Sequence, residues 1–236
     1  MARLSSLEQD QAPILTKIDR RSLKGVAVEQ IRAAILRGEL KPGERVTELG
    51  LAKKLGVGQA TIREALIELD HQGFIQRGSP RKSFVTALSQ RDINEMYLVR
   101  IRLESLVVEL LVAKKGKDLT ACEAAFQKME RAAKRGRVSD FAQADLDFHR
   151  ALWRAAGNRS LLELLERLVP KLFAFVIIQR ADLSRNSMLE NAKQHRRLME
   201  LIREGREKEA KTAIEESMQQ ALSDDLHTSG GTARGT

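Results

Sequence analysis

Hydrophobic residues recur at intervals of three and four through most of the chain, the spacing that gathers them on one face of an α-helix. In the N-terminal third this pattern predicts a helix over residues 26–37, then two short helices that meet at Gly56. A small residue, a glycine four positions later and an apolar residue six beyond it suit two helices that cross at a wide angle. We therefore expect a helix-turn-helix rather than a generic helical hairpin, with a buried face made of Leu51, Ala52, Leu55, Ile62, Ala65, Leu66 and Leu69.

The pattern then changes to short runs that favour β-structure. Residues 74–77 and 83–86 are predicted to form two strands, joined by a turn at residues 78–80. A basic pair, Arg81 and Lys82, follows this turn. The N-terminal third is thus predicted to be a winged helix-turn-helix, whose wing is placed to reach a phosphate backbone or a minor groove.

From residue 89 onward the hydrophobic pattern is helical almost to the end. Ser89, with Asp92 three residues later, resembles a capping box, and Gly116 is expected to end the helix that begins there. Pro170 falls inside another helix and should kink or break it. The remaining helices are expected over residues 119–135, 140–156, 188–204 and 208–226. Short links between these helices predict an all-α antiparallel bundle.

The expected fold class is mostly α, with a small β-hairpin wing in the N-terminal winged helix-turn-helix and a C-terminal helical bundle. The expected divisions are a flexible N-terminal arm at 1–22, the winged helix-turn-helix at 23–87, the bundle at 89–226 and a disordered tail at 227–236.

Charge narrows the class of partner. The formal net charge is +9. The first 88 residues contain 15 basic and 10 acidic side chains, and the remaining residues contain 26 basic and 22 acidic ones. The net positive charge per residue is therefore higher in the N-terminal third. We expect an anionic partner, with nucleic acid favoured over an anionic membrane surface.

Cysteine content and apolar run length concern the compartment. Cys122 is the single cysteine, so an internal disulfide is excluded, and its place in a helical stretch favours a buried thiol. The first twenty residues do not form a secretory signal, and the longest apolar run, residues 172–178, is too short to span a bilayer. We therefore expect a cytoplasmic protein without a membrane partner.

Specific motifs carry a family resemblance. The chain has "LAKKLGV" at residues 51–57 and "REAL" at 63–66, after a Pro-Gly pair at 42–43. This order resembles the DNA-binding domain of GntR-type bacterial transcription regulators, and Arg63 matches the arginine of that family's recognition helix. Departures from the family pattern are Leu49 in place of an arginine, Lys82 in place of a glycine, and Gly58, Gln59, Ala60 and Thr61 in place of Ser-Arg-Thr-Pro.

The departures bear on DNA recognition. Gln59 and Arg63 are four residues apart, on one exposed face of the predicted recognition helix. Arginine suits guanine whereas glutamine suits adenine, so we expect an operator with adenine where relatives read guanine. The remaining expected DNA contacts would position the protein on phosphates, although the basic residues among them could equally be solvated charges: Thr61, Arg45, Arg77, Arg81 and Lys82.

Three polar residues fall on predicted core faces of the bundle. Asp145 and His149 share one face of a helix with Phe148, and His195 lies on the apolar face of another helix. A buried carboxylate is costly without a partner. These residues therefore either bind a divalent metal, for which their ligand types suit Zn²⁺ or Ni²⁺, or form a metal-free polar cluster.

The bundle also carries a resemblance. "VRIRLESLVVELL" at 99–111, "DLDFHRALWRAAGN" at 145–158 and "QHRRLMELIREG" at 194–205 occur in this order. They resemble the FadR C-terminal-domain (FCD) branch of the GntR family, in which a helical bundle senses a small molecule.

This resemblance implies that the three core-facing residues are metal ligands and that a further histidine belongs in the last helix. That position is Ser217 here, which implies a metal site that is weakened or absent. Arg100 matches an arginine that FCD proteins direct into the pocket, where it would bind the carboxylate of a small organic acid. The alternative for Arg100 is a surface ion pair with Glu104.

The leading functional prediction is a repressor that binds a two-fold-related operator on double-stranded DNA as a homodimer and responds to a small carboxylate effector. Two alternatives stay open. One is a metal-dependent hydrolase with a basic targeting arm, although a second inward acid placed as a general base is lacking. The other is an architectural DNA binder that senses no metabolite.

Overall fold

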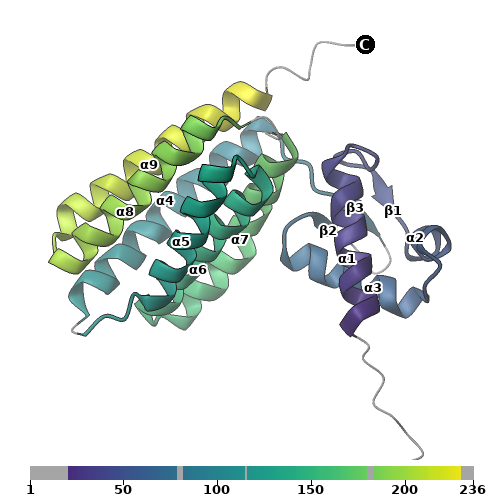
Figure 1. Ribbon diagram of the computed structural model, residues 1–236, viewed down its shortest axis with the longest axis horizontal. Helices are drawn as coiled ribbons and strands as arrows, with labels where there is room; N and C mark the ends of the chain where they lie inside the picture. Colours follow the sequence, from purple (N-terminus) through teal and green to yellow (C-terminus); the bar gives the residue numbers. More distant parts are fainter. Residues whose placement is uncertain (1–20, 79–81, 115, 180–182, 230–236) are drawn as a thin grey trace, which may run out of the picture.

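The computed structural model describes residues 21–78, 82–114, 116–179 and 183–229, which form a small head and a bundle of long helices (Figure 1). The head contains α1 (Arg21–Leu36), β1 (Arg45–Val46), α2 (Glu48–Leu55), α3 (Gln59–His71), β2 (Ile75–Arg77) and β3 (Ser83–Val85). The bundle contains α4 (Gln90–Ala113), α5 (Thr120–Arg135), α6 (Val138–Ala156), α7 (Arg159–Gln179), α8 (Arg185–Glu204) and α9 (Glu207–Ser229). These elements confirm the predicted fold class.

The predicted helix-turn-helix is formed by α2 and α3. The side chain of Thr47 caps α2 by accepting a hydrogen bond from the backbone N–H of Gly50, and Gly56 follows the helix at a φ of 65°. Glycine adopts this left-handed conformation at little cost, which allows the sharp turn into α3. The face of α3 that is buried in the core of the head consists of Ile62, Ala65, Leu66 and Leu69.

The predicted hairpin is present as the antiparallel pair β2 and β3, and a further strand that we did not predict, β1, extends it to a three-stranded sheet in the order β1-β3-β2. Arg45 of β1 and Gln76 of β2 both pair with Phe84 of the central strand. The strand β1 has only two residues, too few to show the alternation that reveals a strand in a sequence. Its Arg45 is therefore held beside the wing by backbone pairing.

Several helices begin or end at residues other than those that we predicted. The capping box of Ser89 and Asp92 is present, but α4 ends at Ala113, before Gly116. The helix α7 continues through Pro170 without a break. Two ends also run into the expected arm and tail, because α1 begins at Arg21 and α9 continues to Ser229. The polar composition of residues 227–229 therefore does not end the helix.

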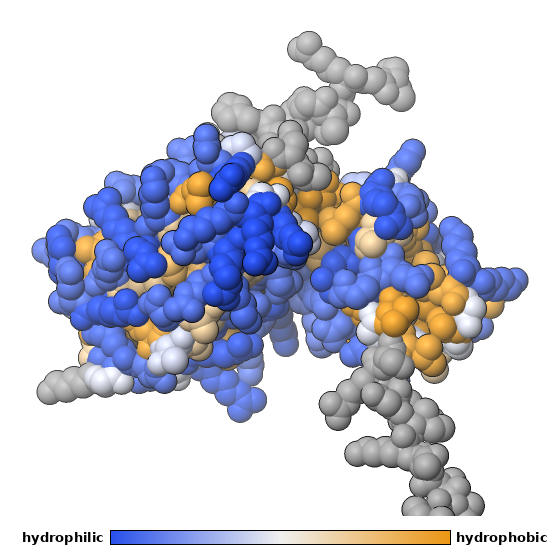
Figure 2. Space-filling model, in the orientation of Figure 1, coloured by the Kyte–Doolittle hydropathy of each residue, from blue (hydrophilic) through white to orange (hydrophobic). Residues whose placement is uncertain are grey.

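The head contacts the bundle through α7, which packs against α1 and α3. Ala174 and Ile177 of α7 are buried in the hydrophobic core of the head. Gly73, directly after α3, has a φ of +81°, and a Cβ added there would lie 2.3 Å from the carbonyl oxygen of Pro170. Only glycine permits this close approach. Figure 2 shows hydrophobic side chains gathered where the bundle meets the head.

The helices and the single cysteine can be compared with the expectations drawn from the sequence. No helix among the described residues is long and apolar enough to cross a membrane. Cys122 is buried in α5, as predicted, and this burial raises the pKa of its thiol to about 12.

Candidate functional site

The first candidate site is the exposed leading end of α3. Gln59 and Arg63 are both exposed there. The Arg63 guanidinium donates from Nε and Nη2 to both carboxylate oxygens of Glu48 in α2, at 2.8–3.1 Å. A base or phosphate that binds Arg63 must therefore compete with an acid of the protein itself, which also holds the guanidinium in place.

The other predicted DNA contacts lie in α3 and in the strands and turn of the wing. Thr61 is half-buried in α3, while the predicted basic contacts in the wing, Arg45, Arg77 and Lys82, are exposed. Arg81 lies outside the described residues. Among the described residues, the helix end and the wing thus present polar and basic side chains on the head.

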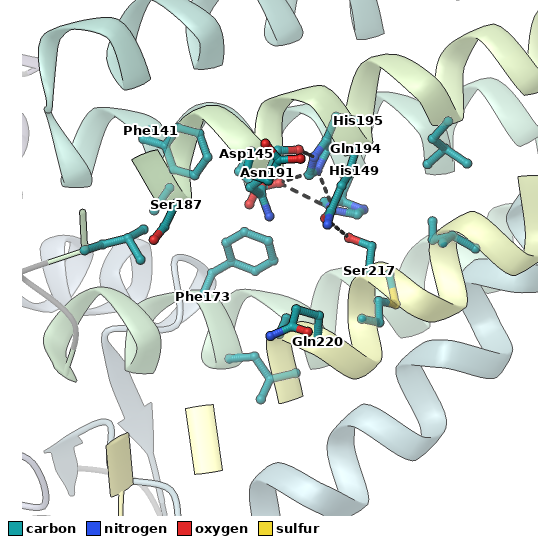
Figure 3. A pocket seen from close by; sticks show the side chains of 18 of the residues that line it. Phe141, Asp145, His149, Phe173, Ser187, Asn191, Gln194, His195, Ser217 and Gln220 are labelled. Atoms are coloured by element: carbon teal, nitrogen blue, oxygen red, sulfur yellow. Dashed lines mark hydrogen bonds and ion pairs between the residues drawn. The ribbon is translucent and has the colours of Figure 1, made fainter. Parts of the chain in front are cut away.

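The second candidate site is a cavity of about 470 Å³ inside the bundle (Figure 3). Its walls come from α4, α6, α7, α8 and α9 and include the rings of Phe141 and Phe173. One end is polar and holds all the predicted metal and effector residues: Arg100, Asp145, His149, His195 and Ser217. The mixture of an apolar wall and a few convergent polar groups is typical of a small-molecule site.

Asp145, His149 and His195 converge at this polar end, as Figure 3 shows. One ligand atom from each residue lies within 4.8 Å of the other two. Asp145 Oδ1 lies 2.8 Å from His195 Nε2 and 3.5 Å from His149 Nε2, and the two Nε2 atoms are 3.3 Å apart. The i, i+4 spacing on α6 and the apolar stripe of α8 therefore bring together what the sequence predicted to face the core.

Hydrogen bonds orient His195. Its Nδ1 lies 2.8 Å from the backbone carbonyl oxygen of Asn191, one turn earlier in α8. Because a carbonyl only accepts, Nδ1 carries a proton, and Nε2 faces the Asp145 carboxylate. Either a proton or a cation at this point balances the carboxylate.

A carboxylate that the sequence analysis did not assign to the site completes the polar end. Glu104 of α4 is fully buried and accepts hydrogen bonds from Arg100 Nε at 2.9 Å and Trp153 Nε1 at 3.1 Å. Its Oε2 also lies 2.8 Å from His149 Nδ1. The ion pair of Arg100 with Glu104, which was the alternative to a pocket role for Arg100, thus exists, but it is buried, and Arg100 also lines the cavity. The spacing of residues in the sequence could have indicated this burial, because Arg100 and Glu104 share one face of α4 with apolar residues. These are Tyr97, Val107, Val108 and Leu111.

The charges of the polar end stabilise one another. Burial alone raises the pKa of Asp145, but the positive charge of His195, whose Nε2 lies 2.8 Å away, holds it below its usual value. Burial lowers the pKa of His195, and Asp145 more than reverses this. Burial likewise opposes ionisation of Glu104, yet His149 and Arg100 bring its pKa down to about 2. The cluster is therefore built to hold carboxylates in their charged form.

Ser217 enters the cavity from α9, and its hydroxyl donates to Gln194 Oε1 at 3.0 Å. A second amide, Asn191, has a buried Oδ1 without a hydrogen-bond partner in the described part of the chain. Gln194 and Asn191 line the same cavity. The region around Ser217 thus offers neutral hydrogen-bonding groups rather than a further imidazole.

The donor set fits a divalent cation. Asp145 Oδ1 is buried and, despite its short distance to His195, lacks a well-directed hydrogen bond among the described residues. A carboxylate oxygen and two imidazole nitrogens are ligands that Zn²⁺ and Ni²⁺ accept. These three residues therefore suit a cation, and the cluster supplies three protein ligands.

Comparisons with known families agree with both parts of the structure. Residues 23–85 match the family described as bacterial regulatory proteins, gntR family, and residues 95–220 match the FCD domain. The match to the second covers the bundle from within α4 to within α9.

Individual relatives are regulators as well. The uncharacterized HTH-type transcriptional regulator YdhC of Bacillus subtilis is 31% identical over 78% of this chain and 83% of its own length. A Paenarthrobacter nicotinovorans protein named as a probable D-xylose utilization operon transcriptional repressor is 27% identical over 84% and 86%. The structure of McbR/YncC from Escherichia coli has a TM-score of 0.68 at 20% identity, over 87% of this chain and 97% of that one, which shows a shared fold.

Proposed function

Because this chain belongs to the GntR family of bacterial transcriptional regulators and carries an FCD domain, we propose that it is a repressor controlled by a small organic acid. It is a DNA-binding regulator and not an enzyme. The observation that carries the effector proposal is the cavity in the bundle, whose buried polar end contains a guanidinium and two imidazoles. The relative named as a repressor supports the sign of regulation.

Arg100 is the group that would bind the carboxylate of the effector. Its side chain lies over the ring of Phe173, with 5.1 Å from Cζ to the ring centroid, and it lines the cavity. A buried guanidinium is fixed in charge and prefers planar anions. The amides of Asn191 and Gln194 could bind hydroxyl or carbonyl oxygens of the same molecule.

A divalent cation would be held by Asp145 Oδ1 and by Nε2 of His149 and His195. When bound, the cation supplies a concentrated positive charge that attracts the effector's carboxylate. Three protein ligands leave positions for that carboxylate or for water. Ser217 supplies no imidazole, which supports weaker metal binding than four ligands would give.

We infer that α7 carries the response from the cavity to the head. Phe173 faces the cavity, whereas its neighbour Ala174 is buried in the core of the head. Ile177 belongs to both the cavity wall and the core of the head. An effector that prefers one position of α7 therefore favours one position of the head.

We further infer that two copies associate through α4. Its outer stripe exposes Leu98 by 65%, Val99 by 50% and Leu106 by 38%. The charged members of the stripe alternate in sign along the helix and are Arg91, Glu95, Arg102 and Glu109. With Leu98 and Val99 at a two-fold axis, an antiparallel pair of α4 helices places Glu95 opposite Arg102 of the second copy. Such a dimer would match a two-fold-related operator.

A thermal-shift screen of short organic acids, with and without Zn²⁺ or Ni²⁺, tests the effector proposal. A ligand of the native state raises the melting temperature, and the same acid should release operator DNA in fluorescence anisotropy. Asp145→Asn should weaken the metal-dependent shift, whereas the matched control Asp147→Asn, on the outer side of α6, should not. A protein that binds its operator but responds to no acid would instead be an architectural DNA binder.

A further inference from the structure

Glu104 is a buried acid that the proposed function does not use directly. It is fully buried in α4, and three side chains from α4 and α6 direct polar groups at its two oxygens. Oε1 accepts from Arg100, while Oε2 faces both Trp153 and His149. Such complete pairing of one carboxylate indicates a fixed orientation for every partner.

The contacts of His149 determine which of its nitrogens carries the proton. Nδ1 lies 2.8 Å from Glu104 Oε2, which is an acceptor because an ionised carboxylate has no proton to donate. Nε2 lies 3.4 Å from Arg100 Nη2, and a guanidinium only donates. One neutral tautomer satisfies both contacts, with the proton on Nδ1 and the lone pair on Nε2. The other tautomer would set lone pair against carboxylate and N–H against N–H.

We propose that Glu104 is a positioning residue at the polar end of the cavity. It holds His149 as the Nδ1–H tautomer, so that the Nε2 lone pair faces Asp145 and His195. The proposal rests on the proposed function, since it assigns the group that prepares His149 to bind a cation. Outer groups of this kind fix the ring and the tautomer of metal-binding histidines.

The same carboxylate also orients the effector-binding group. Because Oε1 takes the Nε–H of Arg100, the remaining guanidinium N–H groups are turned toward His149 and the cavity. Glu104 thus aligns the imidazole for a cation and the guanidinium for an anion at once. Trp153 closes the far side by donating to Oε2.

The test is ¹⁵N NMR of histidine side chains in the full chain without metal, in which long-range couplings distinguish the two tautomers. Four histidines make assignment feasible. The wild-type protein should show His149 protonated on Nδ1. Glu104→Gln replaces an obligatory acceptor with an amide that can also donate, so the Nε2–H form should gain population. The matched control is Glu109→Gln, on the exposed side of the same helix, and it should leave the tautomer unchanged.

Zn²⁺ titration by calorimetry supplies a second measurement. Loss of a group that hydrogen-bonds to a metal-binding histidine typically weakens metal binding by about 10- to 100-fold. The Glu104→Gln protein should therefore bind Zn²⁺ more weakly than the Glu109→Gln protein by about that factor. Wild-type His149 protonated on Nε2 would overturn the proposal, as would an unchanged tautomer in folded Glu104→Gln. Should Glu104→Gln fail to fold, the wild-type tautomer still decides. Absence of Zn²⁺ binding by the wild-type protein would contradict the metal part of the proposed function and leave the tautomer test valid.

Discussion

The side chain of Ser217 determines how many protein groups can hold a cation in the cavity. It enters from α9 and bonds to Gln194, close to the two imidazoles (Figure 3). We predict that Ser217→His adds a metal ligand and raises the affinity for Zn²⁺ at least about 10-fold. Even the loss of a group that only hydrogen-bonds to a ligand lowers metal affinity by about 10- to 100-fold. Calorimetric titration measures this. Ser187→His also places an imidazole on the cavity wall, but away from the cluster, and should not tighten binding; equal affinities would contradict the three-ligand arrangement.

Gln59 is the residue that we expect to set the operator preference. It is exposed one turn before Arg63, at the leading end of α3. Gln59→Arg should change the selected base from adenine to guanine, because a bidentate contact discriminates by about 1–3 kcal/mol. A binding selection from random DNA measures the preference. Gln59→Ala should lose the adenine preference without gaining guanine, and an unchanged sequence from Gln59→Arg would refute the assignment.

Residue-level prediction from sequence works where one helix decides the answer. Asp145, His149 and His195 were predicted to face inward because the period of a helix fixes their faces. Glu104 entered the sequence analysis only in the alternative interpretation of Arg100, as a surface partner, because its partners His149 and Trp153 lie more than forty residues away in the sequence. The chemistry of the site thus depends on contacts between helices that periodicity does not specify.

At the scale of elements, the turn after α3 determines how the head meets the bundle. We predict that Gly73→Ala separates α3 from α7, because its Cβ would meet the Pro170 carbonyl and its φ would be strained. Left-handed backbone costs about 1–2 kcal/mol for alanine, so the melting temperature should fall by at least about 2–4 °C. Scanning calorimetry measures the change.

Gly38→Ala is a matched control for this experiment. Gly38 has a similar φ of +73°, but nothing lies within 4 Å of its added Cβ. It therefore reproduces the backbone strain without the contact. If both variants lost the same stability, the contact with Pro170 would contribute nothing.

Elements with strong periodicity were predicted well, and weak or interrupted ones were not. The helices of the head and bundle follow their apolar spacing. The strand β1 has only two residues, too few to show an alternating pattern. The helix α7 continues through Pro170 because it packs against α4 and α6 of the bundle and against α1 and α3 of the head. Tertiary packing overrides local preference in both cases.

At the scale of the whole molecule, we predict a dimer that depends on the apolar stripe of α4. Leu98→Arg places charge at the centre of the inferred interface and should give monomers in light scattering after size exclusion. Leu23→Arg is the control, because Leu23 is 56% exposed on α1 of the head. A Leu98→Arg protein that stays dimeric would place the interface elsewhere.

The contact of the head with the bundle was beyond sequence prediction for a simple reason. Residues 172–178 form one apolar run, and such a run does not reveal which residues face which partner. In the structure, Leu172 and Phe173 face the cavity, while Ala174 belongs to the head. Division of one helix between two cores is a property of the assembled molecule.

The buried thiol of Cys122 limits what kind of signal this chain can detect. Thiolate is the form that reacts with oxidants and alkylating agents, and a pKa of about 12 keeps the sulfur protonated at neutral pH. Iodoacetamide should therefore leave the folded protein unmodified and label it only in denaturant, as mass spectrometry would show. With no other cysteine in the sequence, peroxide or disulfide stress has no sulfhydryl through which to act.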